Sequence, residues 1–512
     1  MRVLFIFCNF DDLGSSDAIC FLSAVLKRHG HETRLIHLNK EMGPDWSEAS
    51  LERTAAAYRP SLIAFSVVSN QYKHVKAIAG CLRRATAAPM ICGGIHATCQ
   101  PREILDDNLF DYVCVGEGEV ALLELVTKLE AGRPTDDIPG IWVKRDGQIR
   151  QNGPGPLADV EQLPLRDHDI FDMQRLIDSR HGWVRTMTSR GCTYRCSYCY
   201  NHVLLGLYAG RRTPFVRRYR IANVIEELKH LLAKYRNIKV VNFDDDIFMS
   251  DVEYLSQFLT RYRDEIGLPF VCNGHVRHLT EPVARMLRAS GCHLVRFGLE
   301  SGSERVRNSV LDRHMSNDQI RRAFGIAHAA GLPTLAFMQI GIPTEGRDGR
   351  AATLDLLAEI KPSRFRWFYQ FPFPHTRLHD VAECSGLIDR SRMETLENFT
   401  EASCLDFGEE ENLELEKLRR TLHWHVNVRA FPATSHYYAP LIDRVAAMGR
   451  RDWSRVGSEL EGEDARVSAI LSKRGEEHYA LRFKTTMAVL TPTSNDLEAA
   501  LQNGEPRQQQ AG

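Results

Sequence analysis

Residues 189–201 read Ser189-Arg-Gly-Cys192-Thr-Tyr-Arg-Cys196-Ser-Tyr-Cys199-Tyr-Asn201, so that three and then two residues separate three cysteines. Three thiols this close together on a loop could bind zinc or an iron–sulfur cluster, since thiolates suit both. Structural zinc sites usually take four ligands and paired C-x-x-C knuckles, and the sequence has no second pair downstream. Three thiolates leave one iron of a four-iron cluster without a protein ligand, open to a substrate or cofactor.

Length and composition bound the rest of the chain. A chain of 512 residues exceeds the size of one core, so two or three domains are expected. The net charge of -1 provides no global field that would attract nucleic acid or anionic membrane. No apolar run is long enough to span a membrane, and the N-terminus lacks a signal-peptide pattern. We therefore expect a cytoplasmic protein that binds no nucleic acid and has no membrane span.

The cysteines outside residues 189–201 are scattered singly. Thirteen cysteines, an odd number, argue against a disulfide framework and for reduced thiols. Ten of them lie mostly in apolar company, so we expect them to act as small buried hydrophobes.

Before the cysteine stretch, short apolar runs alternate with helical patterns. The runs occupy residues 2–7, 33–38, 62–69, 90–94 and 112–116. This alternation predicts a doubly wound parallel sheet, similar to a Rossmann fold, over residues 1–135. Ligands of such sheets bind at the carboxyl ends of the strands, and glycines there let backbone approach a ligand closely, although a lone glycine is more often only a turn. The candidates at these ends are Ser66, Ser69, Gly93, Gly94, His96, Gly116, Glu117 and Gly118.

Residues 136–184 are predicted to link two domains. Several prolines break regular structure here, and residues 140–153 read as a small hairpin that turns at Asp146-Gly147.

From residue 185 to residue 385 the alternation resumes. A strand leads into the cysteine loop, and further apolar runs at 238–243, 270–277, 294–304 and 335–345 each lead towards an amphipathic helix. We predict a partial parallel (β/α) barrel, with its active site at the carboxyl ends of the strands by analogy to complete barrels.

Two parts of the chain resemble one family. The C-x3-C-x2-C spacing, with Tyr198 before the last cysteine, resembles radical S-adenosylmethionine (SAM) enzymes. The GGIHAT stretch at 93–98 and the VGEGE stretch at 115–119 resemble the cobalamin-binding domain of cobalamin-dependent radical SAM enzymes. The Asp-x-His-x-x-Gly motif of other cobalamin proteins is absent, which implies that the lower face of cobalt lacks that histidine. His96 is expected to make a polar contact rather than to ligate cobalt.

The resemblance implies three cofactors: a [4Fe-4S] cluster on Cys192, Cys196 and Cys199, SAM, and cobalamin on the candidates named above. In this family an acidic strand end binds the methionine ammonium, a G-L-E-S-G-S strand end suits ribose hydroxyls, and an I-G-x-P edge meets adenine. Arg277 could pair with the methionine carboxylate, or make an ordinary ion pair, and the acidic strand end could be only a helix cap. The implied SAM-binding residues are Tyr198, Asp245, Asp246, Arg277, Glu300, Ser301, Gly341 and Pro343.

The C-terminal part carries no family motif. His375 stands where the family often has glycine, and we expect it to be a loop residue. Residues 386–490 are predicted to be mainly helical, with His423 and His425 at the surface, and residues 491–512 to be disordered.

The resemblance implies an enzyme that methylates an unactivated carbon of a small molecule, of the natural-product, lipid or cofactor type, through a 5'-deoxyadenosyl radical and methylcobalamin. An electron donor such as flavodoxin or ferredoxin would be a partner. The alternative within the class is a radical cyclase or rearrangement enzyme that transfers no methyl group. A cobalamin-binding sensor is disfavoured, because a sensor has no need of three closely spaced cysteines.

Overall fold

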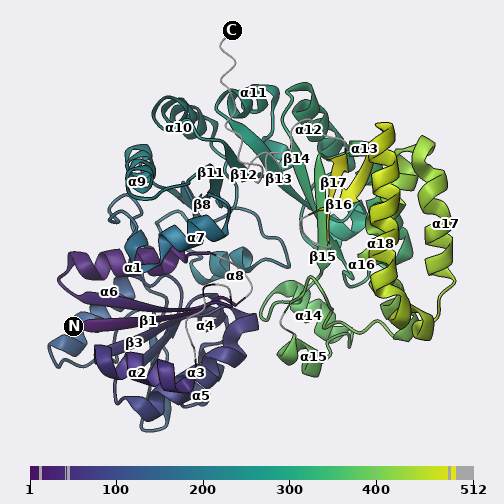
Figure 1. Ribbon diagram of the computed structural model, residues 1–512. Helices are drawn as coiled ribbons and strands as arrows, with labels where there is room; N and C mark the ends of the chain where they lie inside the picture. Colours follow the sequence, from purple (N-terminus) through teal and green to yellow (C-terminus); the bar gives the residue numbers. More distant parts are fainter. Residues whose placement is uncertain (11–13, 41, 43–46, 397, 483–485, 492–512) are drawn as a thin grey trace. The chain divides into compact units, whose positions relative to one another are not determined.

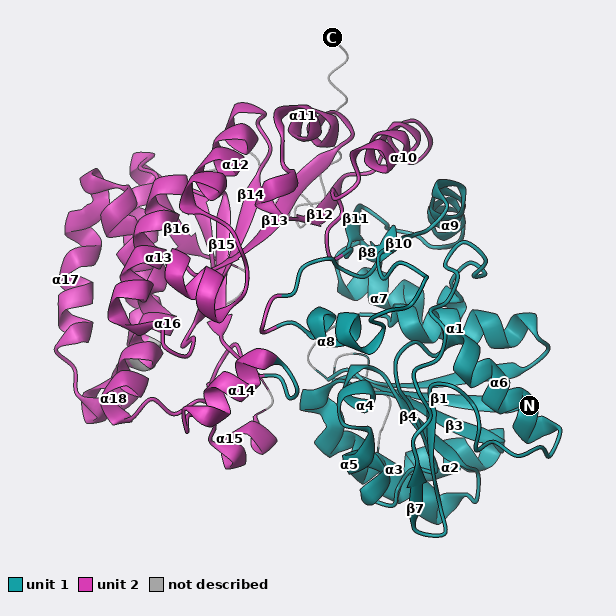
Figure 2. Ribbon diagram, turned by 180° about the vertical axis from the view of Figure 1, so that it is seen from behind, with its two compact units in different colours: residues 1–195, 199–245, 373–376 teal, residues 196–198, 246–372, 377–512 magenta. Residues whose placement is uncertain are grey.

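The structure is a computed structural model that describes residues 1–10, 14–40, 42, 47–396, 398–482 and 486–491. Its contacts divide the chain into two compact units (Figures 1 and 2). Unit 1 comprises residues 1–195, 199–245 and 373–376, and unit 2 comprises residues 196–198, 246–372 and those from 377 onward. The domain boundaries predicted from the sequence differ from the limits of these two units, and they stay a prediction.

Unit 1 opens with a seven-stranded sheet in the order β2-β1-β3-β4-β5-β6-β7, whose first five strands pair in parallel. The predicted doubly wound sheet is therefore confirmed. Its strands are β1 Arg2–Cys8, β2 Glu32–Leu38, β3 Leu62–Ser66, β4 Met90–Gly93, β5 Tyr112–Cys114, β6 Ile141–Arg145 and β7 Gln148–Arg150. The helices between them are α1 Asp17–Arg28, α2 Glu48–Tyr58, α3 Tyr72–Ala85, α4 Ile95–Cys99, α5 Pro101–Asp106 and α6 Glu119–Glu130.

The strand order reverses between β1 and β3. From β1 the chain moves to β2 on one side, and it returns to place β3 on the other side of β1. In open α/β sheets such a reversal opens a crevice at the carboxyl ends of the two central strands. Ser66 is the last residue of β3, and Ser69 begins a 3-10 turn three residues later. Two of the candidate residues thus lie at the switch point of the sheet.

The predicted hairpin forms, and it belongs to the first sheet. β6 and β7 are antiparallel with Arg145 opposite Gln148, so Asp146 and Gly147 make a two-residue turn, both with positive φ. β6 also pairs antiparallel with β5. The stretch predicted to be a linker therefore extends the sheet at its edge.

The remainder of unit 1 carries the cysteine loop. β8 (Trp183–Thr186) and β11 (Val240–Phe243) pair in parallel, and the short β9 (Ser189–Arg190) and β10 (Arg217–Arg218) pair antiparallel. Three helices complete this part: α7 Met173–Ser179, α8 Tyr200–Leu207 and α9 Ile221–Lys234. α9 buries Val224, Leu228 and Leu231 at helical spacing, which is why it packs as an amphipathic helix.

Unit 2 repeats the strand–helix alternation. Its sheet runs β16-β17-β15-β14-β13-β12, and the strands from β12 to β15 pair in parallel. The parallel strands are β12 Phe270–Gly274, β13 Cys292–Glu300, β14 Thr334–Ile340 and β15 Arg364–Tyr369. The helices of the alternation are α10 Val252–Glu265, α11 Glu281–Ala289, α12 Asn317–Ala329 and α13 Gly346–Ile360. The predicted strand–helix repeats of the barrel are confirmed.

The C-terminal part is mainly helical but ends in strands. Its helices are α14 Arg377–Cys384, α15 Arg390–Thr395, α16 Glu409–Ala430, α17 Ser435–Ala446 and α18 Arg450–Arg474. The region predicted to be mainly helical also contains two strands after Arg474. β16 (His478–Leu481) and β17 (Met487–Thr491) pair antiparallel, and β17 adds antiparallel to β15. The predicted disordered tail lies, beyond residue 491, outside the described residues. Within the described part of the chain, no helix combines the length and apolarity needed to cross a membrane.

Candidate active site

The three cysteines lie on the loop between β9 and α8. Cys196 is buried, whereas Cys192 and Cys199 are half-buried. Gly191 turns the chain just before Cys192 with φ +90°, and a Cβ at this position would lie 2.5 Å from the Phe215 carbonyl oxygen. Cys199 is the N-cap of α8, and its Sγ accepts a hydrogen bond of 3.5 Å from the Asn201 amide. A donor set of three thiols at this spacing fits an iron–sulfur cluster with one open iron.

The middle of the loop is anchored within unit 2. The Ser197 amide donates to the Leu311 carbonyl at 2.8 Å, and the Ser197 hydroxyl donates to the Val310 carbonyl at 2.6 Å. The Leu378 amide donates to the Ser197 carbonyl at 3.0 Å. Both faces of the backbone around Cys196 are therefore fixed by neighbouring segments.

Tyr198 and Glu300, both implied SAM-binding residues, are in contact. The Tyr198 hydroxyl donates to Glu300 Oε1 at 2.9 Å, and the Gln339 side chain donates to Glu300 Oε2 at 3.0 Å. Glu300 ends β13 with a φ of 69° and is buried. Burial raises the pKa of the Glu300 carboxyl, and Arg313 and the two hydrogen bonds oppose the rise.

Arg313 is a residue that the sequence reasoning missed. Its Nε donates to the Gly298 carbonyl at 2.9 Å, and its Nη1 lies 3.3 Å from Cys196 Sγ. The positive guanidinium complements the negative charge that a cluster with thiolate ligands would carry. This contact supports the fit of a cluster at Cys196. Arg313 lies between Asp312 and His314, near Arg305 and Arg307, so the local sequence held no signal that singled it out.

Three other implied SAM residues are buried within unit 2. The Ser301 hydroxyl donates to Glu345 Oε1 at 2.7 Å, so it is already used inside the fold. Burial raises the pKa of Glu345 to about 7, while the Ser301 hydrogen bond and two arginines oppose the rise. Gly341 has φ +71°, a conformation that favours glycine, and Pro343 follows it in the same buried turn.

The two aspartates at the acidic end of β11 lie in different surroundings: Asp245 is buried and Asp246 is exposed. Asp245 is 1% exposed and accepts hydrogen bonds from the Thr188 amide, the Thr188 hydroxyl at 2.7 Å and the Ser189 hydroxyl at 2.5 Å. Burial raises the pKa of Asp245, and these hydrogen bonds oppose the rise. The geometry makes Asp245 a residue that holds the strand leading to Cys192. Asp246 and Arg277 are exposed.

Two of the candidate glycines of the first sheet leave space for neighbouring segments of the protein itself. A Cβ on Gly94, whose φ is +97°, would lie 2.7 Å from the Val67 backbone nitrogen and oxygen. A Cβ on Gly116, with φ +90°, would lie 2.1 Å from the Tyr208 hydroxyl oxygen. A Cβ on Gly118 would lie 3.3 Å from a Leu22 methyl carbon, whereas a Cβ on Gly93 would make only ordinary van der Waals contacts. Close packing between loops thus explains Gly94 and Gly116.

His96 and Ser69 form a small polar cluster in unit 1. His96 Nδ1 lies 3.2 Å from Ser69 Oγ, and the same oxygen lies 2.9 Å from the hydroxyl of Tyr200, the residue after Cys199. Burial lowers the pKa of His96 to about 4, so the ring is neutral at pH 7. Its Nε2 is buried and has no hydrogen-bond partner among the described residues. An unsatisfied buried nitrogen beside a strand end fits a polar group of a bound cofactor.

Glu117, an implied cobalamin residue, is half-buried and pairs with the buried Arg217. Its carboxylate accepts two hydrogen bonds from Arg217, the closer at 2.5 Å, and one of 2.8 Å from the Ala158 amide. Burial raises the pKa of Glu117, but the arginine hydrogen bonds outweigh it, and the pKa is below its usual value. Arg190, two residues before Cys192, pairs with Glu119 at 2.6 Å. The VGEGE stretch therefore holds β9 and β10.

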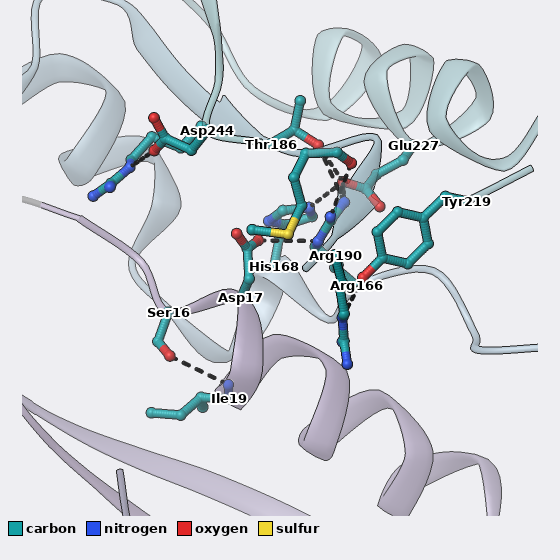
Figure 3. Close-up of polar contacts among 12 residues, drawn as sticks. Ser16, Asp17, Ile19, Arg166, His168, Thr186, Arg190, Tyr219, Glu227 and Asp244 are labelled. Atoms are coloured by element: carbon teal, nitrogen blue, oxygen red, sulfur yellow. Dashed lines mark hydrogen bonds and ion pairs between the residues drawn. The ribbon is translucent and has the colours of Figure 1, made fainter. Parts of the chain in front are cut away.

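A second arginine stabilises the same part of unit 1 (Figure 3). Arg166 donates to Glu227 Oε1 at 2.6 Å and lies 3.0 Å from Asp17. Burial raises the pKa of Glu227, but Arg166 and His168 outweigh this effect and lower the pKa to about 2. The guanidinium groups of Arg166 and Arg190 lie 4.7 and 4.8 Å from the centroid of the Phe21 ring. These contacts connect α1 to the strand that precedes the cysteine loop.

In the C-terminal part, the prediction of a surface position is wrong for His423. The side chain is fully buried, its Nε2 lies 2.8 Å from Asp464 Oδ1, and the Trp424 indole donates to the same oxygen at 2.7 Å. α18, which carries Asp464, covers α16 and removes this histidine from solvent. His425 is half-buried, and His375 is an exposed loop residue with φ +63°, which explains glycine at this position in the family.

Comparisons with known proteins assign two domains. Residues 12–126 match the B12 binding domain family, and residues 186–357 match the radical SAM superfamily. The chain is 26% identical to an uncharacterized methyltransferase of Pyrococcus horikoshii, over 71% of this chain and 78% of that protein. It is 24% identical to cytidylyl-2-hydroxyethylphosphonate methyltransferase of Streptomyces wedmorensis, over 72% of this chain and 78% of that protein.

A third relative has another activity. The chain is 21% identical to the anaerobic magnesium-protoporphyrin IX monomethyl ester cyclase of Rubrivivax gelatinosus, over 80% of this chain and 75% of that protein. Among solved structures, the radical SAM methyltransferase TsrM of Kitasatospora setae, with cobalamin and a [4Fe-4S] cluster bound, superposes with a TM-score of 0.63. That match has 21% identity and covers 76% of this chain and 79% of that chain, and it shows the shared fold. The chain therefore carries a domain of the B12 binding family ahead of a domain of the radical SAM superfamily.

Proposed function

We propose that this protein is a cobalamin-dependent radical SAM methyltransferase that acts on carbon in a small molecule. The observation that carries the proposal is the combination of a B12 binding domain with a three-cysteine radical SAM domain in one chain. Two relatives matched over more than two thirds of their length are named methyltransferases.

In this proposal Cys192, Cys196 and Cys199 hold a [4Fe-4S] cluster. Tyr198 and Glu300 form one wall of the SAM site, because their hydrogen bond places a carboxylate beside the cysteine loop segment in unit 2. Asp246 and Arg277 are exposed and able to meet the charged ends of methionine. Gly341 and Pro343 provide the backbone edge for adenine.

Cobalamin is proposed to bind at the switch point of the first sheet. Ser66 and Ser69 lie there, His96 contacts Ser69, and the unsatisfied Nε2 of His96 supports a polar ligand group. Gly93, Gly94, Gly116 and Gly118 shape the strand-end loops, and Glu117 holds them to β10 through Arg217.

When bound, the cluster and SAM would supply a radical that removes a hydrogen atom, and cobalamin would supply the methyl group. The residues of the chain orient these groups and keep water away. The buried Glu300 of unit 2, with its raised pKa, and the neutral His96 of unit 1 each lie in surroundings of low polarity within their own unit. We also propose a cytoplasmic location and reduction by a flavodoxin or ferredoxin, conditions in which thiols and clusters stay reduced.

A second candidate function is a radical cyclisation without methyl transfer, which the Rubrivivax gelatinosus relative favours. The two functions differ in their products from SAM. A methyltransferase consumes two SAM molecules for each product and releases one S-adenosylhomocysteine and one 5'-deoxyadenosine. A cyclase that transfers no methyl group forms no S-adenosylhomocysteine.

The test uses the full chain, purified anaerobically and reconstituted with iron, sulfide and cobalamin. With SAM and a reductant, we expect both S-adenosylhomocysteine and 5'-deoxyadenosine by mass spectrometry. Cys196→Ala should lose the cluster signal and 5'-deoxyadenosine. The matched control is Cys384→Ala, which removes an exposed cysteine of α14 and should keep both. 5'-Deoxyadenosine without S-adenosylhomocysteine would favour the cyclase, and an intact cluster in Cys196→Ala would contradict the proposed ligand set.

A further inference from the structure

We propose that Arg313 is a positioning residue that raises the reduction potential of the cluster through a hydrogen bond to Cys196 Sγ. The inference rests on the proposed function in one respect, since it takes Cys196 to be a cluster ligand. It adds a role for a residue outside the cysteine motif and outside the implied SAM-binding residues.

The first step is geometric. Arg313 Nη1 lies 3.3 Å from Cys196 Sγ, which is hydrogen-bonding distance to sulfur. The guanidinium is held on its other side, where Nε donates to the Gly298 carbonyl at 2.9 Å. The Arg313 amide also donates to the Arg307 carbonyl at 2.8 Å, which fixes the backbone of the donor.

The acceptor is equally fixed. Cys196 is 5% exposed, and the next residue, Ser197, is bound to Val310 and Leu311, which belong to the same segment as Arg313. Donor and acceptor are thus parts of one anchored structure. Ordering a long side chain for a single contact costs conformational entropy that offsets most of the energy of the contact. The Arg313 side chain is already ordered by its other hydrogen bond, so the contact with Cys196 requires little further ordering.

The second step concerns space and charge. A Cβ on Gly298 would lie 2.3 Å from Glu300 Oε1 and 3.1 Å from Arg313 Nη2, so only glycine leaves room for both groups. The Glu300 oxygens receive hydrogen bonds from Tyr198 and Gln339. Within the part of the chain that the structure describes, no carboxylate forms an ion pair with Arg313, and the Cys196 sulfur at 3.3 Å is the neighbour that would carry negative charge as a cluster ligand.

The third step is electrostatic. Reduction adds an electron, and therefore negative charge, to a cluster and its thiolate ligands. A guanidinium remains positive at any pH that the protein meets, and an N–H···S hydrogen bond withdraws charge from the sulfur. In a partly buried site this stabilises the reduced state more than the oxidised state, because the effective dielectric constant is low. Arg313 therefore makes the cluster easier to reduce.

The test measures the midpoint potential of the cluster by redox titration monitored by electron paramagnetic resonance, in the full chain reconstituted with iron and sulfide and without SAM. Arg313→Gln removes the charge and should shift the potential to more negative values. Arg313→Lys keeps the charge but loses the planar fork, and should shift it less. The control is Arg305→Gln, an exposed arginine of the same segment that donates to the Thr344 carbonyl, and it should leave the potential unchanged.

Two outcomes would overturn the inference: equal potentials in wild type and Arg313→Gln, or loss of the cluster from both Arg313 variants with an unchanged circular dichroism spectrum. The last would make Arg313 a requirement for cluster binding rather than a residue that sets its potential. A cluster that survives in Cys196→Ala would instead contradict the proposed ligand set, so the two failures are distinguishable.

Discussion

Gly94 illustrates how a missing side chain fixes a loop. With φ 97° and ψ -172°, it occupies a region of backbone conformation that is essentially open to glycine alone. The Val67 backbone lies where a Cβ would be, at 2.7 Å, and the His96 amide donates to the Val67 carbonyl at 3.2 Å. The position of His96 therefore depends on the absence of a side chain two residues earlier.

Gly94→Ala should destabilise unit 1 by about 2 kcal/mol, because alanine is strained in this conformation and its Cβ meets backbone atoms. The control is Gly80→Ala, in the middle of α3, where a Cβ would have nothing within 4 Å. That change should be stabilising by about 0.5–1 kcal/mol, since alanine favours helix. Urea unfolding of both variants checks the prediction, and equal effects would contradict it.

Glu345 should make stability depend on pH. Its folded pKa of about 7 lies above the ordinary value of 4.5. Between these values the folded carboxyl keeps a proton that the unfolded chain releases, so stability falls as pH rises from 4.5 to 7 and then levels off. The loss is at most about 3 kcal/mol. Glu345→Gln, which still accepts from Ser301, should lose less stability between pH 5 and pH 8 than wild type, whereas Glu359→Gln, exposed on the same helix, should match wild type.

At the scale of elements, the contacts between α6 and β9 hold the strand that leads to the cysteines. Glu119, in the first turn of α6, is buried and lies 2.6 Å from Arg190. The same arginine donates to the Tyr219 hydroxyl at 2.6 Å and lies 4.8 Å from the Phe21 ring centroid. Removing one partner of a buried ion pair is costly, because the remaining charge stays in a medium of low polarity.

Glu119→Gln should destabilise the protein by about 3 kcal/mol. Glu124→Gln, on the same helix, breaks only a half-exposed pair with Lys128 and should change stability by less than about 0.5 kcal/mol. Thermal unfolding and the iron content after reconstitution measure the two effects. A Glu119→Gln protein as stable as Glu124→Gln would show that the pair between α6 and β9 does not hold the loop.

The elements themselves were largely predictable. β1 is a continuous apolar run after Arg2, which is typical of buried parallel strands, and the Asp146-Gly147 turn is specified by local chemistry. The sequence did not predict β16 and β17, because these strands depend on contacts with distant parts of the chain. β17 pairs with β15, and the Asn427 side chain of α16 forms hydrogen bonds with both the amide and the carbonyl of Tyr479 in β16. No pattern within residues 478–491 contains that information.

The site was predictable in its chemistry but not in its partners. The cysteine spacing identifies the cluster motif, yet the sequence does not show that Asp245 is bound by Thr188 and Ser189, or that Arg313 reaches Cys196. These contacts join residues 56 to 117 positions apart. Side chains that serve a cofactor and side chains that hold the fold carry the same chemical groups, so only their neighbours distinguish them.

At the scale of the whole molecule, the residues proposed for cobalamin all belong to unit 1. The loops that carry Ser69, His96 and Glu117 are held by contacts within that unit, to Tyr200, Val67 and Arg217. None of these contacts uses a cysteine sulfur. Cobalamin binding should therefore be separable from cluster binding.

The double variant Cys192→Ala and Cys196→Ala should lose the cluster and still bind hydroxocobalamin within about threefold of the wild-type Kd, a change below about 1 kcal/mol. Cys199 is retained because its sulfur caps α8, the helix that carries Tyr200. Absorbance spectra after gel filtration measure the bound cobalamin. Gly94→Ala is the opposite control, since displacing His96 should weaken cobalamin while the three cysteines are intact. If the double variant loses cobalamin and Gly94→Ala keeps it, the proposed cobalamin residues are wrong, because binding would then depend on the cysteines and not on the strand ends of the first sheet.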